Sequence, residues 1–223
     1  MLGPTRSTGR RWAWLALFAL AMAQLEATVV VYLRALYYPD GFQFPLVIIR
    51  DRIAAIEIGR EAATIVMLVS VAILSCRDAW RRWAAFLLLF GFWDLGYYLW
   101  LKLMLDWPPS LLTWDVLFVI PLPWVGPVLS AAAVAVIMVV AGLAVDILRD
   151  HDRTIRVGKL GWALTLASVG GLLVAFMADA GSVVEGRQPG PFPWWLWTVS
   201  LVPAVGVAAL AAQRAWRAGP DAG

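Results

Sequence analysis

Residues Ile53 to Cys76 read IAAIEIGREAATIVMLVSVAILSC, and this stretch decides the fold class. It exceeds the roughly 20 apolar residues that an α-helix needs to cross the hydrocarbon core of a bilayer. Glu57, Arg60 and Glu61 interrupt it. An ionisable group deep in a membrane helix costs about 2.5–3.5 kcal/mol on insertion scales, so such groups are rare and commonly mark a site. The stretch therefore predicts a membrane-spanning helix that carries a polar site.

Composition extends this interpretation to the whole chain. The 223 residues are 62% apolar, with a mean hydropathy of +0.77. Soluble domains contain roughly 45–50% apolar residues. Repeated apolar runs predict six spans, at about 13–36, 53–76, 83–105, 128–148, 160–179 and 194–213. We therefore expect an all-α membrane protein, a bundle of six transmembrane helices.

Charge and rare residues exclude several classes of function. The net charge is +3, but the basic residues are spread over short loops, so we expect the lipid bilayer as a partner and no nucleic acid. The single cysteine, Cys76, excludes an intrachain disulfide and multi-cysteine metal sites. The single histidine, His151, excludes a haem held by two histidines and a histidine-based metal centre. We therefore expect no cofactor, and the sequence does not indicate a metal.

The distribution of basic residues predicts the orientation. Twelve of the 18 Lys and Arg residues lie at alternate span ends, on the side of both termini. The positive-inside rule places that side, including tails 1–12 and 214–223, in the cytoplasm. Residues 1–23 also resemble a cleavable signal peptide. The apolar run continues to Tyr38, which favours an uncleaved first span.

The first three spans, within residues 13–105, are expected to form a polar site. Four carboxylic residues lie at similar predicted depth: Glu26, Glu57, Glu61 and Asp94. Glu57 and Glu61 share one helix face, and the hydroxyl groups of Tyr97 and Tyr98 follow Asp94 by one turn. Arg60 is the only cation expected at this depth, which leaves an excess of three negative charges.

That excess requires compensation, because uncompensated charge in a low dielectric is very costly. Arg34 and Lys102 could reach inward from the outer span ends, some carboxyl groups could stay protonated, or a cation could bind. The alternative is structural: Arg60 pairs with Glu26 or Asp94 and only holds three helices together.

The later spans, within residues 128–213, look like packing helices. Their mid-membrane positions lack ionisable groups, and small residues recur at four-residue spacing: Ala163, Ala167, Gly171 and Ala175, then Ala204, Ala208 and Ala212. Such seams let helix backbones approach closely, within the chain or against a partner subunit or second copy.

Residues 106–127 are too apolar for an ordinary loop and are interrupted by proline. Thr113 can cap a short helix that runs to Ile120. We expect a half-helix or interfacial segment that roofs or gates the polar site. The candidate roof residues are Trp114, Asp115, Pro121, Pro123 and Trp124.

Two motifs carry a resemblance to a family. The string WDLGYY at 93–98, followed by LLTWDVLFVIPLPWVGP at 111–127, resembles uncharacterised bacterial multi-pass inner-membrane proteins. The resemblance covers most of the chain from Thr28 to about Val140. It implies a bacterial inner-membrane location and assigns no activity and no site residue.

Three functions follow from these features. The favoured one is a non-enzymatic protein that binds or moves protons, a cation or a small cationic solute through Glu57, Glu61 and Asp94. The second is an accessory subunit of a larger membrane complex. The third is an enzyme acting on a lipid or isoprenoid, with two carboxyl groups as acid and base and Tyr97 or Tyr98 as donor. No reaction signature supports the third, so no catalytic residue is assigned.

Overall fold

The computed structural model describes residues 5–47 and 52–219. Within these ranges six helices are long and apolar enough to cross a membrane, so the prediction of six such helices is confirmed. Their bounds are α1 Arg6–Tyr37, α2 Arg52–Ser75, α3 Ala79–Leu105, α4 Val128–Asp150, α5 Lys159–Met177 with its short continuation α6 Ala180–Val184, and α7 Trp194–Ala218. The chain is predominantly helical and compatible with a multi-pass membrane protein.

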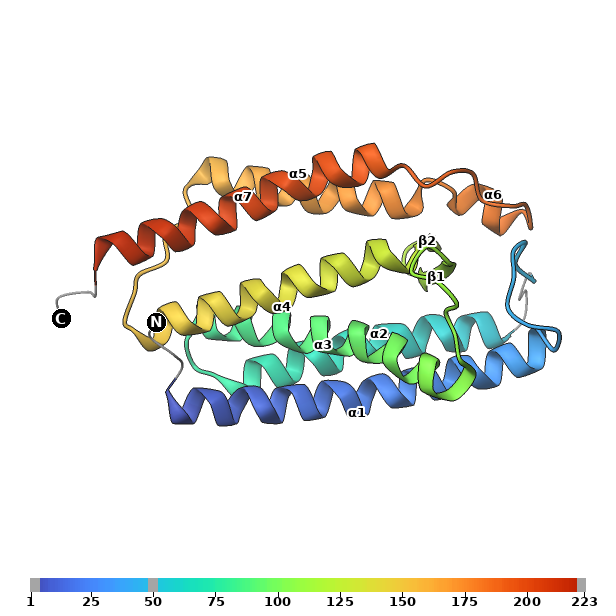
Figure 1. Ribbon diagram of the computed structural model, residues 1–223, viewed down its shortest axis with the longest axis horizontal. Coiled ribbons are helices and arrows are strands. Elements are labelled where there is room, and N and C mark those ends of the chain that lie inside the picture. The colour runs from blue at the N-terminus through green and yellow to red at the C-terminus, as the bar shows by residue number, and fades with distance from the viewer. Residues whose placement is uncertain (1–4, 48–51, 220–223) are drawn as a thin grey trace.

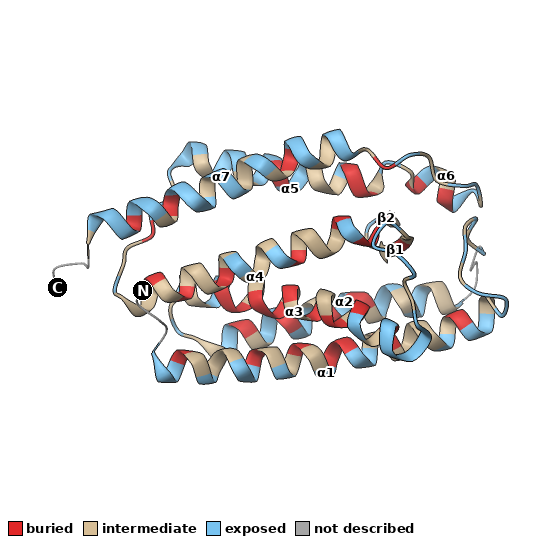
Figure 2. Ribbon diagram, viewed as in Figure 1, coloured by how far each residue is buried: buried red, intermediate tan, exposed pale blue. Residues whose placement is uncertain are grey.

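Helix α3 is the centre of the packing, between α1 and α4 (Figure 1). Small residues permit the close approach on both sides. A Cβ at Gly142 would lie 2.9 Å from the Ala84 carbonyl oxygen, and one at Gly96 would lie 2.9 Å from the Ala23 Cβ. The buried positions accordingly concentrate on α1 and α3 (Figure 2). This close contact fixes how deep each polar residue of α1 and α3 lies relative to the other helix.

Helices α5 and α7 pack on each other beyond α4 (Figure 1). The expected small-residue seam is present in part. Gly171 lies against Ser200, since an added Cβ would approach the Ser200 Oγ to 2.1 Å, and Ala175 is buried. Ala163, Ala167 and Ala208 are exposed. Most positions of these two helices are exposed in the isolated chain (Figure 2), as expected for surfaces that face lipid.

The segment before α4 differs from the prediction. The prediction of a helix from Thr113 to Ile120 is wrong. Strands β1 Trp114–Phe118 and β2 Trp124–Pro127 form an antiparallel hairpin instead. Pairing runs from Trp114 opposite Pro127 to Phe118 opposite Trp124, with a bulge in between. The aromatic and β-branched residues of this run favour strand over helix, and Pro121 and Pro123 lie in the connection, where no ladder donor is needed.

The hairpin is joined directly to the start of α4. The Val128 N–H donates to the Thr113 carbonyl oxygen at 2.9 Å, and the Leu129 N–H donates to the Leu111 carbonyl oxygen at 2.7 Å. These bonds satisfy amide donors of the first helical turn, which have no partner inside a helix. The hairpin is thereby fixed at one end of the helices.

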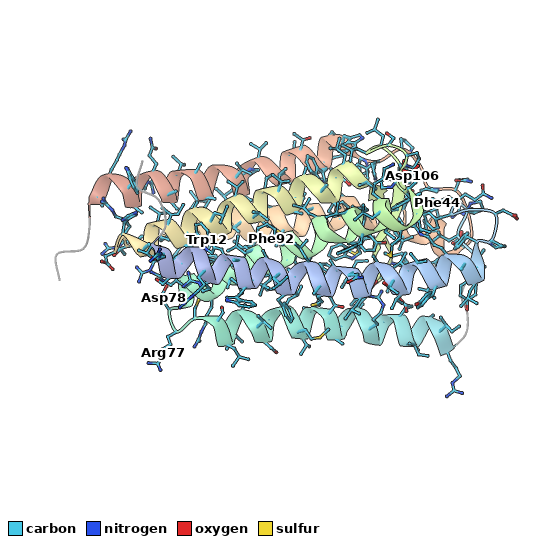
Figure 3. All side chains as sticks on the ribbon, turned by 60° about the horizontal axis from the view of Figure 1, so that its bottom comes forward. Trp12, Phe44, Arg77, Asp78, Phe92 and Asp106 are labelled. Atoms are coloured by element: carbon cyan, nitrogen blue, oxygen red, sulfur yellow. The ribbon has the colours of Figure 1, made fainter. Side chains whose placement is uncertain are left out.

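The opposite end carries its own buried ion network. Asp146, 1% exposed, accepts from Arg11 at 2.5 Å and from the Trp12 indole N–H at 2.7 Å, which ties α1 to α4. Arg81 of α3 pairs with Asp150 at 2.9 Å. Figure 3 shows Trp12 and Asp78 at this end and Phe44 and Asp106 at the hairpin end. The first residue of α1 and the last of α7 also lie at the end away from the hairpin (Figure 1).

Candidate functional site

A cavity of about 470 Å³ lies at the hairpin end of the molecule, and we call it the acidic cavity. Its walls come from α1, α2, α3, the 38–47 loop, the hairpin and α6. Its charged lining residues are Glu26, Arg34, Glu57, Arg60, Glu61, Asp94 and Asp115. The described wall therefore carries five carboxyl groups and two guanidinium groups. All seven residues predicted for the ligand site line it: Glu26, Glu57, Arg60, Glu61, Asp94, Tyr97 and Tyr98.

Arg60 of α2 is the centre of the first charged group. Its guanidinium forms an ion pair with Glu26 of α1 and another with Glu57 at 2.8 Å. The Thr64 hydroxyl donates to the second oxygen of Glu26 at 3.2 Å. Glu26 and Glu57 thus share one cation, which joins α1 to α2. From the sequence, Arg60 could pair with Glu26 or Asp94 as a link between helices, and the structure shows the pair with Glu26.

Glu61 makes a different connection. Its carboxylate accepts a 2.8 Å hydrogen bond from the Val119 N–H, at the start of the connection between the two strands. The Arg60 guanidinium lies 3.9 Å away, at the edge of ion-pair range. Glu61 is 6% exposed. One carboxylate of α2 therefore holds the tip of the hairpin against the helices.

Arg34 and Asp115 form the second charged group. The Arg34 Nη2 lies 3.1 Å from the Asp115 Oδ1, and Arg34 is 8% exposed. The guanidinium also lies over the rings of Trp107 and Phe42, 3.8 and 4.3 Å from their centroids, in cation–π geometry. Burial raises the pKa of Asp115 to about 6, against the opposing effect of Arg34. This pair ties β1 to α1.

Asp94 of α3 lies on the cavity wall in the same part of the site. Its electrostatic neighbour is Asp115, a like charge. Three buried polar atoms of the cavity wall have no hydrogen-bond partner among the described residues: the Asp94 Oδ2, the Asp115 Oδ2 and the Trp93 Nε1. Buried polar atoms are almost always paired in proteins, so these three atoms are exceptions within the cavity wall.

The tyrosines lie between the two charged groups. Tyr97 and Tyr98 contact each other edge to face, with centroids 5.0 Å apart. Tyr97 is within electrostatic reach of Asp115 and Arg34 on one side and of Glu26 and Arg60 on the other. The aromatic rings therefore form the wall that connects the groups.

The five residues predicted as a roof separate into two sets. Asp115, Pro121 and Pro123 line the acidic cavity. Trp114 instead packs against Phe44 and Phe192 and lines a separate outer groove, while Trp124 stacks on Phe176. Side chains alternate between the two faces of a strand, which directs Trp114 away from the cavity when Asp115 points toward it.

Arg34 and Lys102, the two cations that could compensate the excess negative charge of the site, point in different directions. Arg34 does reach inward, as far as Asp115. Lys102 does not: it pairs with Asp106 at 2.5 Å and both side chains are at least half exposed. Its hydrogen bond lowers the pKa of Asp106. Lys102 lies in the last turn of α3, where a short path to Asp106 and to solvent is available.

Sequence reasoning left Arg34 and Trp93 out of the site. Arg34 lies two turns beyond Glu26 on the same apolar helix, and this spacing was the available signal. Trp93 precedes Asp94 and is 5% exposed. Its place in the site could not be predicted from the sequence, because tryptophans occur throughout this chain.

The lining of the acidic cavity combines charged with apolar side chains. Among the described residues no three Asp, Glu, His or Cys side chains gather closely enough to hold a metal ion. The lining contains many apolar and aromatic side chains besides the carboxyl groups.

Comparison of the chain with protein-family models, with curated proteins and with solved structures gives no match.

Proposed function

We propose that this chain is a non-enzymatic membrane protein whose acidic cavity binds a small organic cation. The observation that carries the proposal is the imbalance of five carboxyl groups against two guanidinium groups around one cavity. Removing an unbalanced charge from water costs several kcal/mol per ion, so a positively charged occupant stabilises this arrangement.

Asp94 is the carboxylate that we assign to the ligand. Glu26 and Glu57 are paired with Arg60, Asp115 with Arg34, and Glu61 accepts from Val119. Asp94 has an oxygen without a hydrogen-bond partner among the described residues and a like charge as its neighbour. An ammonium group placed there satisfies the oxygen and separates the two like charges.

The remainder of the lining supports an organic cation. The lining includes the aromatic side chains of Tyr97, Tyr98 and Phe42, which suit a cation or its hydrocarbon part, and Val30, Leu33 and Ile58 add apolar wall. A volume of about 470 Å³ lies within the range of small-molecule sites.

We place the protein in the bacterial inner membrane with both termini in the cytoplasm. The support is the concentration of basic residues at one side, together with the resemblance carried by residues 93–98 and 111–127. The acidic cavity then lies toward the outer side of the membrane.

The test is calorimetric titration of the purified protein with butylamine at neutral pH, with sodium chloride as the comparison. We expect saturable binding of butylamine, and a loss of roughly tenfold or more in affinity in Asp94→Asn. The matched control is Asp106→Asn, a replacement of the exposed carboxylate at the end of α3. Absence of saturable binding to the folded wild type, or equal binding by Asp94→Asn, would refute the proposal.

A further inference from the structure

The carboxyl groups of the acidic cavity are divided between two ends. One group contains Glu26, Glu57 and Glu61 around Arg60. The electrostatic neighbours of Glu61 are Arg60, Glu26 and Glu57, all within this group. We call it the α2 pole, because three of its four members belong to α2.

The second group contains Asp94 and Asp115 with Arg34, and we call it the hairpin pole. The electrostatic neighbour of Asp94 is Asp115, and Asp115 is paired with Arg34 at 3.1 Å. Tyr97 is within reach of charges at both poles and therefore lies between them. The two poles have separate cations, Arg60 and Arg34, and both line one cavity.

Each pole has more carboxyl groups than guanidinium groups. At the α2 pole three carboxyl groups share Arg60, and Glu61 is the most distant from it, at 3.9 Å. At the hairpin pole Arg34 pairs with Asp115, and the electrostatic neighbour of Asp94 is the like charge of Asp115. A single cation cannot balance both poles when it is bound at one of them.

An independent observation points to a ligand at the hairpin pole. The Asp94 Oδ2 is buried and has no hydrogen-bond partner in the described structure, whereas the neighbouring Asp115 is already contacted by Arg34, Tyr97 and Tyr98. A buried carboxylate oxygen without a donor matches an N–H donor of an ammonium group.

The remaining wall of the cavity is largely apolar. It includes Val30, Leu33, Ile58 and Val116, besides the ring of Tyr97. Such a wall suits a hydrocarbon chain and does not hydrate a charge. The ligand chemistry that matches this cavity has a cation at each end and methylene groups between them.

We propose that the cation of the acidic cavity is a linear aliphatic diamine or polyamine. One ammonium group is held by Asp94 and Asp115, the other by Glu61, and the methylene chain lies along Tyr97. This inference rests on the proposed function, since it names the chemical class of the cation bound at the same site.

The test is a calorimetric comparison of butylamine with diaminobutane, extended to α,ω-diaminoalkanes of three to eight carbons. We expect diaminobutane or one of its longer homologues to bind roughly tenfold tighter than the monoamine of the same chain length, as a second ion pair of about 1.4 kcal/mol would give. We expect affinity to pass through a maximum with chain length, because the poles are fixed.

A variant at the α2 pole identifies the source of the higher affinity for the diamine. Glu61→Gln keeps an oxygen acceptor for the Val119 N–H and removes one negative charge from the α2 pole, the one assigned to the second ammonium group. In this variant the advantage of the diamine should disappear while monoamine binding at Asp94 remains. Asp106→Asn should retain both affinities, and the monodispersity and circular dichroism of each variant report folding.

The outcomes separate the two proposals. A diamine advantage that is present in the wild type and lost in Glu61→Gln supports the diamine. Equal affinity for monoamines and diamines at every chain length overturns the diamine and leaves the organic-cation site standing. Failure of the folded wild type to bind either class overturns both.

Discussion

At the scale of single residues, Arg60 is the cation on which the α2 pole depends. It pairs with Glu26 and Glu57 and lies within 4 Å of Glu61. Loss of Arg60 would leave buried carboxylates without a partner. The free-energy cost of an unpaired buried charge is much larger than the stabilisation that the ion pair provides.

We therefore expect Arg60→Met to lower the free energy of unfolding by about 3 kcal/mol. The double variant Arg60→Met/Glu26→Gln should recover part of this loss, because one orphaned charge is removed. Thermal unfolding in mild detergent measures both. An Arg60→Met protein as stable as the wild type would show that the pole is balanced by other groups.

Asp115 provides a pH-dependent prediction. Burial raises its pKa to about 6 from an ordinary 3.8, so the folded state holds this proton more tightly than the unfolded state. The contribution of Asp115 to the free energy of unfolding therefore falls as pH rises from about 4 to about 6, and is constant above that range.

Asp115→Asn removes this titration. We expect the melting temperature of the variant minus that of the wild type to increase between about pH 4 and pH 6 and then to level off. A difference that is independent of pH across this window would mean that Asp115 titrates normally. Thermal unfolding over a pH series measures this difference.

Several of these residue contacts follow from the sequence alone. The pairing of Arg60 with Glu26 is confirmed, because depth along two apolar helices can be counted from their ends. The partner of Arg34 was not predictable, since Asp115 lies 81 positions away in a segment whose structure was predicted wrongly. An inward-reaching Lys102 was one of the possibilities left open by the sequence, and the side chain instead pairs with Asp106.

At the scale of elements, the hairpin is a wall of the acidic cavity that carboxyl groups attach to α1 and α2. It is held by the Arg34–Asp115 pair at β1 and by the Glu61–Val119 hydrogen bond at its tip. Both attachments use carboxyl groups of the acidic cavity, so the cavity and the position of the hairpin depend on the same residues.

We expect Glu61→Ala to expose the Val119 amide. A buried donor without its acceptor costs about 1–3 kcal/mol, which corresponds to roughly tenfold faster hydrogen exchange or more. Glu61→Gln keeps an acceptor and should retain protection. Exchange measured by mass spectrometry over residues 115–123 tests this, and unchanged uptake in Glu61→Ala would remove Glu61 from the attachment.

The helices were predictable and the hairpin was not, for one physical reason. A run of twenty apolar residues in a membrane protein must satisfy its own backbone and is therefore helical. A five-residue apolar run such as Trp114–Phe118 fits a strand or a helix equally well from periodicity. The choice is made by pairing with Trp124–Pro127 and by the prolines between them, which outweigh the capping signal of Thr113.

At the scale of the whole molecule, α1, α2 and α3 supply the helical walls of the acidic cavity, α4 packs on α3, and α5 with α7 form a further layer. The sequence placed α4 among the packing helices without indicating that it lies directly against α3. Gly91 and Gly142 allow α3 and α4 to approach closely. The spacing of these glycines in the sequence does not indicate which helix each of them contacts.

The orientation is a prediction at this scale. If both termini are cytoplasmic, a fluorescent protein fused after residue 223 should fluoresce in bacteria, and alkaline phosphatase fused there should be inactive. A phosphatase fusion within the 106–113 segment should be active. The reverse pattern would place the acidic cavity on the cytoplasmic side.

The central claim is that an organic cation occupies the acidic cavity at Asp94. Crystals grown with para-bromobenzylamine test it most directly, because bromine gives an anomalous signal that no atom of the protein reproduces. We predict one bromine peak inside the cavity, with the ammonium group at the Asp94 Oδ2, and its loss in Asp94→Asn. A well-ordered cavity without a bromine peak, or a peak that persists in the variant, would contradict the claim.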